Sequence, residues 1–254
     1  MAHLFVGTSG YNYDAWKGPF YPPKLASAKL LAYYADRFPA VEINYSFYRL
    51  PAPTTLRKWL GEVPQGFRFV LKCWQRITHQ RRLKDTDELV LAFADTARTL
   101  GPQLGPILVQ LPPNLKLDLP RLDAFLAVLP GDLRAAFEFR HPSWFTDGVY
   151  AALEARGHAL CVAESAELAV PLVRTAPWGY LRLRREDYTP DDLATWAERL
   201  RGAGFSDDLY VFFKHEDDAR GPAFAAAFAA HFPEHGPPGT LIRARLDPRA
   251  PTVS

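Results

Sequence analysis

Short apolar runs alternate with longer amphipathic segments along most of the chain. Eight apolar runs have the length and composition of buried strands: Leu4–Val6, Val41–Ile43, Phe67–Leu71, Ile107–Leu111, Ala135–Phe139, Leu160–Ala163, Tyr180–Leu183 and Leu209–Phe213. Seven other segments have helical periodicity: Leu25–Phe38, Thr54–Glu62, Glu88–Leu100, Pro120–Leu129, Gly148–Arg156, Pro190–Arg201 and Pro222–Phe232. This alternation predicts βαβ units and a parallel sheet.

The chain length favours closing these units into one barrel. It has 254 residues, and one (β/α)8 barrel typically has roughly 250. The pattern therefore predicts an α/β fold, a single TIM-type (β/α)8 barrel over residues 1–233, with its site at the carboxyl ends of the strands. Residues 165–177 have the weakest helical pattern, and we expect the Gly- and Pro-rich residues 234–254 to form a partly ordered tail.

Composition narrows the functional classes only a little. A formal net charge of +2 neither requires nor excludes a nucleic-acid partner. Cys73 and Cys161 lie in strand-like runs without metal-ligand spacing, which is typical of reduced, buried thiols. The sequence has no signal-peptide pattern and no apolar run of about 18 residues, so we expect a cytoplasmic protein with no membrane partner.

Several predicted strands carry charged residues, although parallel strands are usually apolar on both faces. Side chains alternate along a strand, so Glu42 and Asn44 share one face while Val41 and Ile43 share the other. The outer face of a barrel packs under helices, so the polar face must point inward. The inward residues lie late in their strands and should meet at the mouth: Glu42, Asn44, Lys72, Gln110, Glu138, Arg140, Arg182 and Lys214.

This inward set has two carboxylates and four cations. Unpaired burial of such ions is costly, so they must bind one another, water or a ligand. A closed network of salt bridges is one interpretation. The second interpretation is a pocket for a phosphate or carboxylate. The excess of cations favours this second interpretation, because a closed network does not need more cations than carboxylates.

Five ordered motifs run from about residue 4 to residue 230. They are Gly7–Tyr13 with Trp16 and Phe20–Pro22; Val41–Asn44 with Ser46–Arg49 and Pro51; Phe67–Phe69 with Lys72, Ile77–His79 and Arg82–Leu83; Leu108–Pro113; and Phe137–His141 with Ser143–Trp144. Together they resemble the YecE-like family (domain of unknown function seventy-two).

The resemblance implies a TIM-type barrel and no established activity. The fold type is shared with sugar-phosphate isomerases and apurinic endonucleases, which is weak evidence for chemistry. The chain departs from the family pattern after the seventh strand, where Leu183–Arg185 replaces a His-Gly pair. It departs again after the eighth, where His215–Asp218 replaces an Asn-rich stretch.

Three residues are the candidates for catalysis: Glu42 and Glu138 as an acid–base pair, with Lys72 beside them. Aromatic side chains of the first loop could stack on sugars or bases, and the basic loop His79–Lys84 could contact phosphates. The candidate ligand-binding residues are Ser9, Tyr11, Trp16, Asn44, Tyr48, Arg49, His79, Gln110, Arg140, His141, Trp144, Arg182 and Lys214.

We expect neither a metal nor a cofactor, because no histidine pair has a ligand spacing and no dinucleotide or Walker motif is present. Three functions stay open. The first is an enzyme, a hydrolase or isomerase, acting on a small phosphorylated or anionic ligand. The second is a nucleic-acid or nucleotide binder, and the third a degenerate barrel with a structural ion network. The sequence leaves the oligomeric state open.

Overall fold

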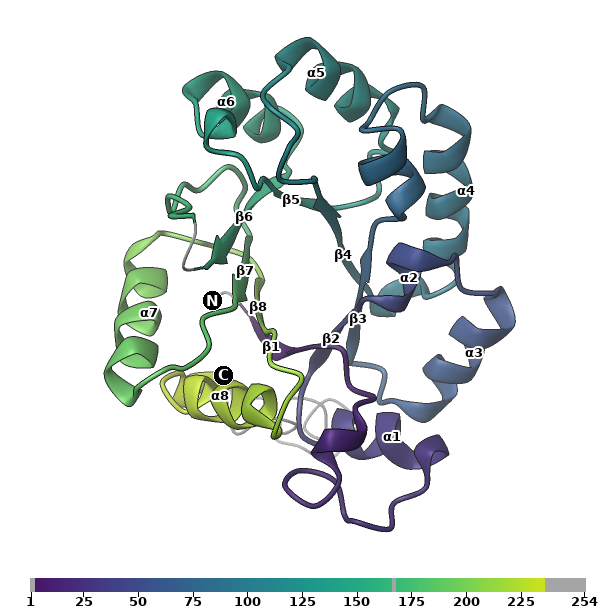
Figure 1. Ribbon diagram of the computed structural model, residues 1–254, viewed down its shortest axis with the longest axis vertical. Coiled ribbons are helices and arrows are strands. Elements are labelled where there is room, and N and C mark those ends of the chain that lie inside the picture. Colours follow the sequence, from purple (N-terminus) through teal and green to yellow (C-terminus); the bar gives the residue numbers. More distant parts are fainter. Residues whose placement is uncertain (1–2, 166–167, 236–254) are drawn as a thin grey trace, which may run out of the picture.

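Eight parallel strands close into a barrel in the computed structural model, which describes residues 3–165 and 168–235. Each strand pairs with the next in sequence, and the last pairs with the first, as Figure 1 shows down the barrel axis. The strands are β1 (Leu4–Ser9), β2 (Ala40–Ile43), β3 (Arg68–Lys72), β4 (Leu104–Gln110), β5 (Ala135–Glu138), β6 (Ala159–Glu164), β7 (Gly179–Leu183) and β8 (Leu209–Phe213). The predicted α/β barrel is therefore confirmed.

The helices lie outside the strands (Figure 1). They are α1 (Leu30–Ala35), α2 (Tyr45–Tyr48), α3 (Pro53–Glu62), α4 (Asp87–Arg98), α5 (Leu119–Val128), α6 (Asp147–Glu154), α7 (Pro190–Gly202) and α8 (Arg220–Ala229). Proline opens α3 and α7, where its missing N–H costs no hydrogen bond. The described residues between β6 and β7 form no helix, in line with the weak helical pattern there.

Side chains along the strands alternate between the helices and the barrel interior as predicted. Val41 and Ile43 of β2 join the core beneath the helices, whereas Ala40 belongs to a separate cluster inside the barrel. Large aromatic side chains fill the interior together with small ones: Tyr180 pairs in register with Cys161, and both belong to the interior cluster that includes Phe212 and Ala163. Because this packing fills the lower barrel, the inward polar residues gather near the carboxyl ends of the strands.

Three further expectations concern the cysteines, membrane-spanning helices and the C-terminal tail. Cys73 and Cys161 are buried free thiols. In the described part of the chain, no helix has the length and apolarity to cross a membrane. Residues 234 and 235 belong to a short 3-10 turn, and the rest of the expected tail, residues 236–254, lies outside the described residues.

Candidate active site

The guanidinium of Arg182, at the carboxyl end of β7, binds two carboxylates across the barrel. Its Nη2 lies 2.8 Å from Oε1 of Glu42 on β2, and its Nη1 lies 2.5 Å from Oε2 of Glu138 on β5. Both carboxylates are fully buried, and Arg182 is 1% exposed. Three strands thus contribute to one ion network that lies across the mouth.

Each carboxylate also accepts bonds from neutral donors. Ser9 Oγ and Tyr180 Oη donate to Glu42, the latter over 2.6 Å. Gln110 Nε2 donates to Glu138 over 2.9 Å. These bonds satisfy the remaining lone pairs, which a buried ion pair needs if it is not to be destabilising.

Glu138 is held as an anion. Burial acts to raise the pKa of this carboxyl, but Arg182 and Arg184 outweigh it and hold the pKa below its usual range. Arg184 Nη1 lies 3.3 Å from Glu138 Oε1. Because Glu42 and Glu138 bind the same guanidinium, their geometry suits holding Arg182 in place better than dividing acid and base roles.

Lys72, the last residue of β3, differs from these ions because it has no carboxylate partner. No ion pair includes it within the described residues, and its Nζ lies 4.0 Å from the ring centre of Phe47. Burial, then the charges of Arg182 and Lys214, lower its pKa to about 8, against the opposing effect of both glutamates. An amine of this kind loses its proton close to neutral pH.

His79 packs against the same ring. It lies on a short π-helical turn, Arg76–Gln80, with its ring centre 4.9 Å from that of Phe47. Thr78 Oγ1 lies 2.9 Å from its Nδ1. Burial and the charges of Lys72 and Arg140 lower its pKa to about 4, so the imidazole is neutral at pH 7.

Phe47 therefore contacts both titratable groups, Lys72 and His79. It is not among the site residues predicted from the sequence. The sequence indicates a role for Phe47 only through its place in the second motif, between Ser46 and Tyr48. A buried aromatic residue after a strand is more often core than site, which is why pattern alone passes over it.

Two further cations lie at the mouth. Arg140, just after β5, is half-buried and takes part in no ion pair among the residues described. Lys214, just after β8, is 3.9 Å from Glu216. The cation excess expected at the mouth is therefore present and centres on Lys72 and Arg140.

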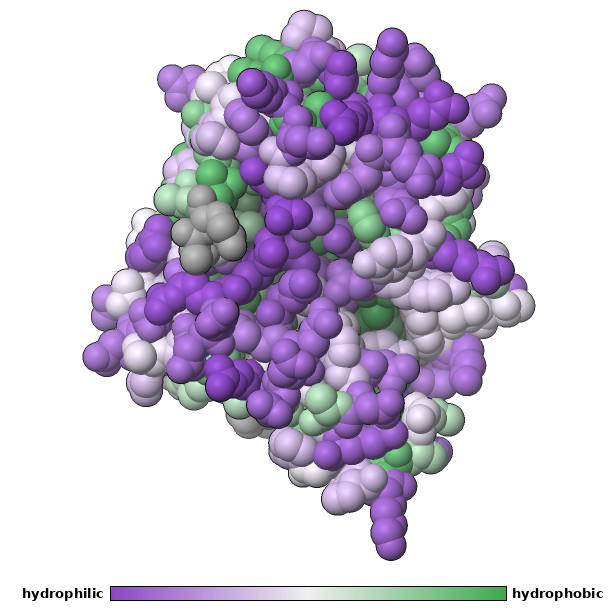
Figure 2. Space-filling model, viewed as in Figure 1, coloured by the Kyte–Doolittle hydropathy of each residue, from purple (hydrophilic) through white to green (hydrophobic). Residues whose placement is uncertain are grey.

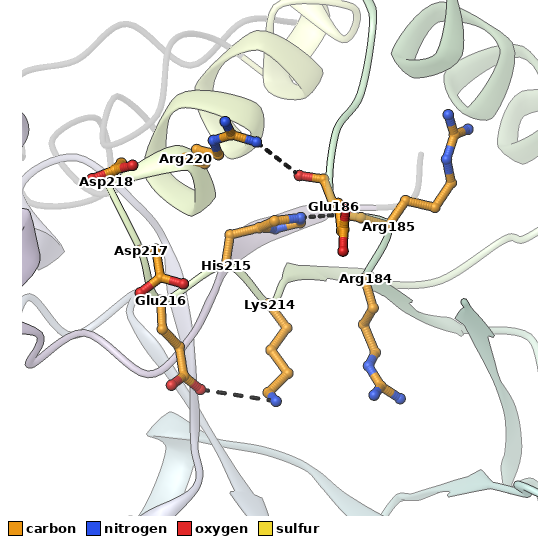
Figure 3. A pocket seen from close by; sticks show the side chains of 9 residues that line it. All are labelled: Arg184, Arg185, Glu186, Lys214, His215, Glu216, Asp217, Asp218 and Arg220. Atoms are coloured by element: carbon orange, nitrogen blue, oxygen red, sulfur yellow. Dashed lines mark hydrogen bonds and ion pairs between the residues drawn. The ribbon is translucent and has the colours of Figure 1, made fainter. Parts of the chain in front are cut away.

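A cavity of about 550 Å³ lies beside the mouth, between the loops after β7 and β8 (Figure 3). In Figure 3 the side chains of Arg184 and Lys214 point the same way, whereas Arg185 points away from them. Four cationic and four acidic residues line the cavity together with His215: Arg184, Arg185, Lys214 and Arg220, with Glu186, Glu216, Asp217 and Asp218. Its charges balance, so it lacks the cation excess of the mouth.

The two predicted tryptophans are buried completely. Trp16 Nε1 donates to the carbonyl of Glu216, and Trp144 Nε1 donates to that of Leu115. The Trp144 ring also stacks on Phe139, 4.6 Å away. These rings stabilise the loops and offer no face to a ligand, a departure from their predicted role.

The remaining predicted residues lie around the rim. Tyr11 and Asn44 line a second cavity of about 260 Å³, and Asn44 Nδ2 donates to Ser9 Oγ over 3.2 Å. Tyr48 is 67% exposed, and Arg49 is also exposed. Figure 2 shows hydrophilic side chains covering most of the centre of this view, where the surface is hollowed.

His141 has a local role at the rim. Its Nδ1 lies 2.8 Å from Ser143 Oγ and also accepts from the backbone N–H of Ser143. No three His, Cys, Asp or Glu side chains form a metal-ligand cluster anywhere in residues 3–165 and 168–235.

The fold and its mouth define a (β/α)8 barrel with a buried Glu–Arg–Glu network and a cationic opening. Residues 5–245 match the family described as "Protein of unknown function DUF72". The chain belongs to this DUF72 family.

Two curated proteins are similar in sequence to part of this chain. The UPF0759 protein YecE of Escherichia coli (strain K12) is 37% identical over 116 residues, which are 45% of this chain and 43% of that protein. The UPF0759 protein YunF of Bacillus subtilis (strain 168) is 33% identical over 156 residues, 58% of this chain and 54% of that protein. The chain thus spans about half the length of these relatives.

Solved structures resemble the whole barrel. The DUF72 family protein TM1631 of Thermotoga maritima MSB8 has a TM-score of 0.76 and 26% identity, covering 87% of this chain and 96% of that one. The DUF72 family protein EF0366 of Enterococcus faecalis V583 has a TM-score of 0.73 at 17% identity, covering 91% and 98%. The second likeness concerns the fold alone.

Replacing the central guanidinium should destabilise the protein strongly. Arg182→Met strands two buried carboxylates, so we expect the free energy of unfolding in urea at pH 7 to fall by about 3–5 kcal/mol. Arg98→Met is the control, because the pair of Arg98 with Asp132 is on the surface and should change stability little. Equal, small losses for both variants would show that the network contributes little.

The effect of the Lys72 charge on the pKa of His79 can be tested by NMR titration of the histidine side chains. In the wild type, His79 should titrate at about pH 4. Lys72→Met removes a positive charge that lowers this pKa, so the pKa of His79 should rise. His158, whose pKa of about 4 reflects burial and Arg156, should not move. An ordinary pKa of His79 in the wild type, or an unchanged pKa in Lys72→Met, would contradict the influence of the Lys72 charge on His79.

Proposed function

We propose that the protein is an enzyme, an isomerase or hydrolase, that binds a small phosphorylated or carboxylate-bearing substrate at the barrel mouth. One observation carries the proposal. Arg182 engages both buried carboxylates, while Lys72 and Arg140 have no ion-pair partner among the described residues. An anionic ligand would supply the missing partner.

The balance of charge supports an anion over a cation or a neutral ligand. Glu42 and Glu138 are offset by Arg182 and Arg184. Lys72 and Arg140 then add positive charge in a partly desolvated place, where attraction to an anion is stronger than in bulk water. Recessed mouths of this kind also concentrate oppositely charged substrates.

The titratable groups suit proton transfer at neutral pH. Lys72, with a pKa of about 8, can exchange its proton there, and His79, with a pKa of about 4, is neutral and available as a weak base. Glu42 and Glu138 then act as positioning residues that hold Arg182. Acid–base work thus falls to Lys72 and His79, in place of the glutamate pair that was a candidate from the sequence.

Nucleic-acid binding has weaker support. Trp16 and Trp144, two of the expected aromatic residues, are fully buried and offer no stacking surface. Stacking on exposed aromatic rings is a main source of affinity for single strands. A purely structural network explains Arg182 but not the uncompensated charges of Lys72 and Arg140.

Inorganic phosphate is the simplest probe of the site. We expect it to raise the melting temperature of the wild type, with a dissociation constant measurable by calorimetry. Lys72→Met and Arg140→Met should each weaken binding about tenfold or more, equal to about 1.4 kcal/mol. Lys24→Met removes an exposed lysine that is in no ion pair among the described residues, and it should leave binding unchanged.

The result can also overturn the proposal. Absence of phosphate and sulfate binding to the wild type at low ionic strength contradicts an anion site. Equal weakening by Lys24→Met would show that binding reflects only the total charge of the protein. Binding that is confined to DNA or RNA and falls steeply with salt would favour the nucleic-acid alternative.

A further inference from the structure

We propose that Lys72 is a nucleophile that forms an imine with an aldehyde or ketone group of the anionic substrate. The inference rests on the proposed function and names the substrate class more closely: a small anion that carries a carbonyl. It is carried by the setting of the Lys72 amine, which lies on the face of Phe47, apart from any carboxylate and beside His79.

The surroundings of Lys72 set it apart from the lysines that form ion pairs. Lys17, Lys58 and Lys214 each lie within 4 Å of a carboxylate. Lys72 instead has the ring of Phe47 at 4.0 Å. The charged and titratable groups that act on it are Arg182, Glu42, Glu138, Lys214 and, from the turn after β3, His79.

Both glutamates bind Arg182, and neither forms an ion pair with the Lys72 amine. Only the neutral form of an amine attacks a carbonyl, and desolvation next to another cation is one way in which proteins obtain it. With a pKa of about 8, roughly a tenth of the Lys72 side chains are neutral at pH 7. An ordinary lysine is neutral in only about four cases in ten thousand.

The step balances without an oxidant or reductant. The ammonium of Lys72 first releases a proton to solvent. Its neutral Nζ then attacks the carbonyl carbon as the carbonyl π bond breaks, and the carbonyl oxygen takes up a proton from solvent to give a carbinolamine. His79 accepts a proton from the nitrogen and returns it to the departing hydroxyl, which leaves as water. Overall, an ammonium ion and a carbonyl give a protonated imine and water.

A protonated imine gives the weakly basic amine of Lys72 a chemical role within the cationic mouth. The positive nitrogen draws electrons from the neighbouring carbon, so a proton on that carbon becomes easier to remove. His79, neutral at pH 7, could accept that proton. This chemistry belongs to the isomerase branch of the proposed function, and Arg140 holds the substrate's anionic group.

The test is reductive trapping with glyoxylate, a small anionic aldehyde, and cyanoborohydride at pH 7, on the intact wild-type protein. Peptide mass spectrometry gives the labelling rate of each lysine. We expect Lys72 to be labelled at least tenfold faster than exposed Lys24. Inorganic phosphate should slow labelling of Lys72 without affecting Lys24. The rate at Lys72 should rise with pH and level off just above pH 8.

Two results distinguish failure of the imine from failure of the anion site. If phosphate binds the wild type but Lys72 is labelled no faster than Lys24, the imine is overturned and the anion site stands. If Lys72 is labelled quickly but phosphate neither binds nor protects it, the anion-carbonyl substrate class and the proposed function are both overturned.

Discussion

One guanidinium, that of Arg182, sets the arrangement of the barrel mouth. It lies between Glu42 and Glu138, with Nη atoms 2.8 and 2.5 Å from their oxygens. All three groups are removed from water, so each is stable as an ion only while the others remain in place. Strands β2, β5 and β7 are therefore tied together by charge at the level where the apolar interior ends.

The consequence for function is that the buried carboxylates are already engaged. Arg184 contributes a further contact to Glu138. Lys72 and Arg140 are left to face the opening without ion-pair partners among the residues described. The titratable groups at the mouth that the ion network does not engage are therefore an amine and an imidazole, and both contact Phe47.

Much of this arrangement follows from the sequence, because alternation along a strand fixes which face a residue occupies. Glu42 and Arg182 could be placed inside the barrel since Val41 and Leu181 had to face the helices. The pairing of ions could not be predicted, because it depends on which side chains reach across the barrel. Loops were less predictable still, and alternation says nothing about whether Trp16 or Trp144 turns inward.

The central claim is that the mouth binds an anion between cations that the network leaves uncompensated. Crystals grown with tungstate test it directly, because the anomalous signal of tungsten locates the ion without prior assumptions. The expected result is one strong peak at the mouth, in contact with Lys72 and Arg140. A mouth without tungstate, in which Lys72 contacts Glu42 or Glu138, would contradict the claim and leave a structural ion network as the better explanation.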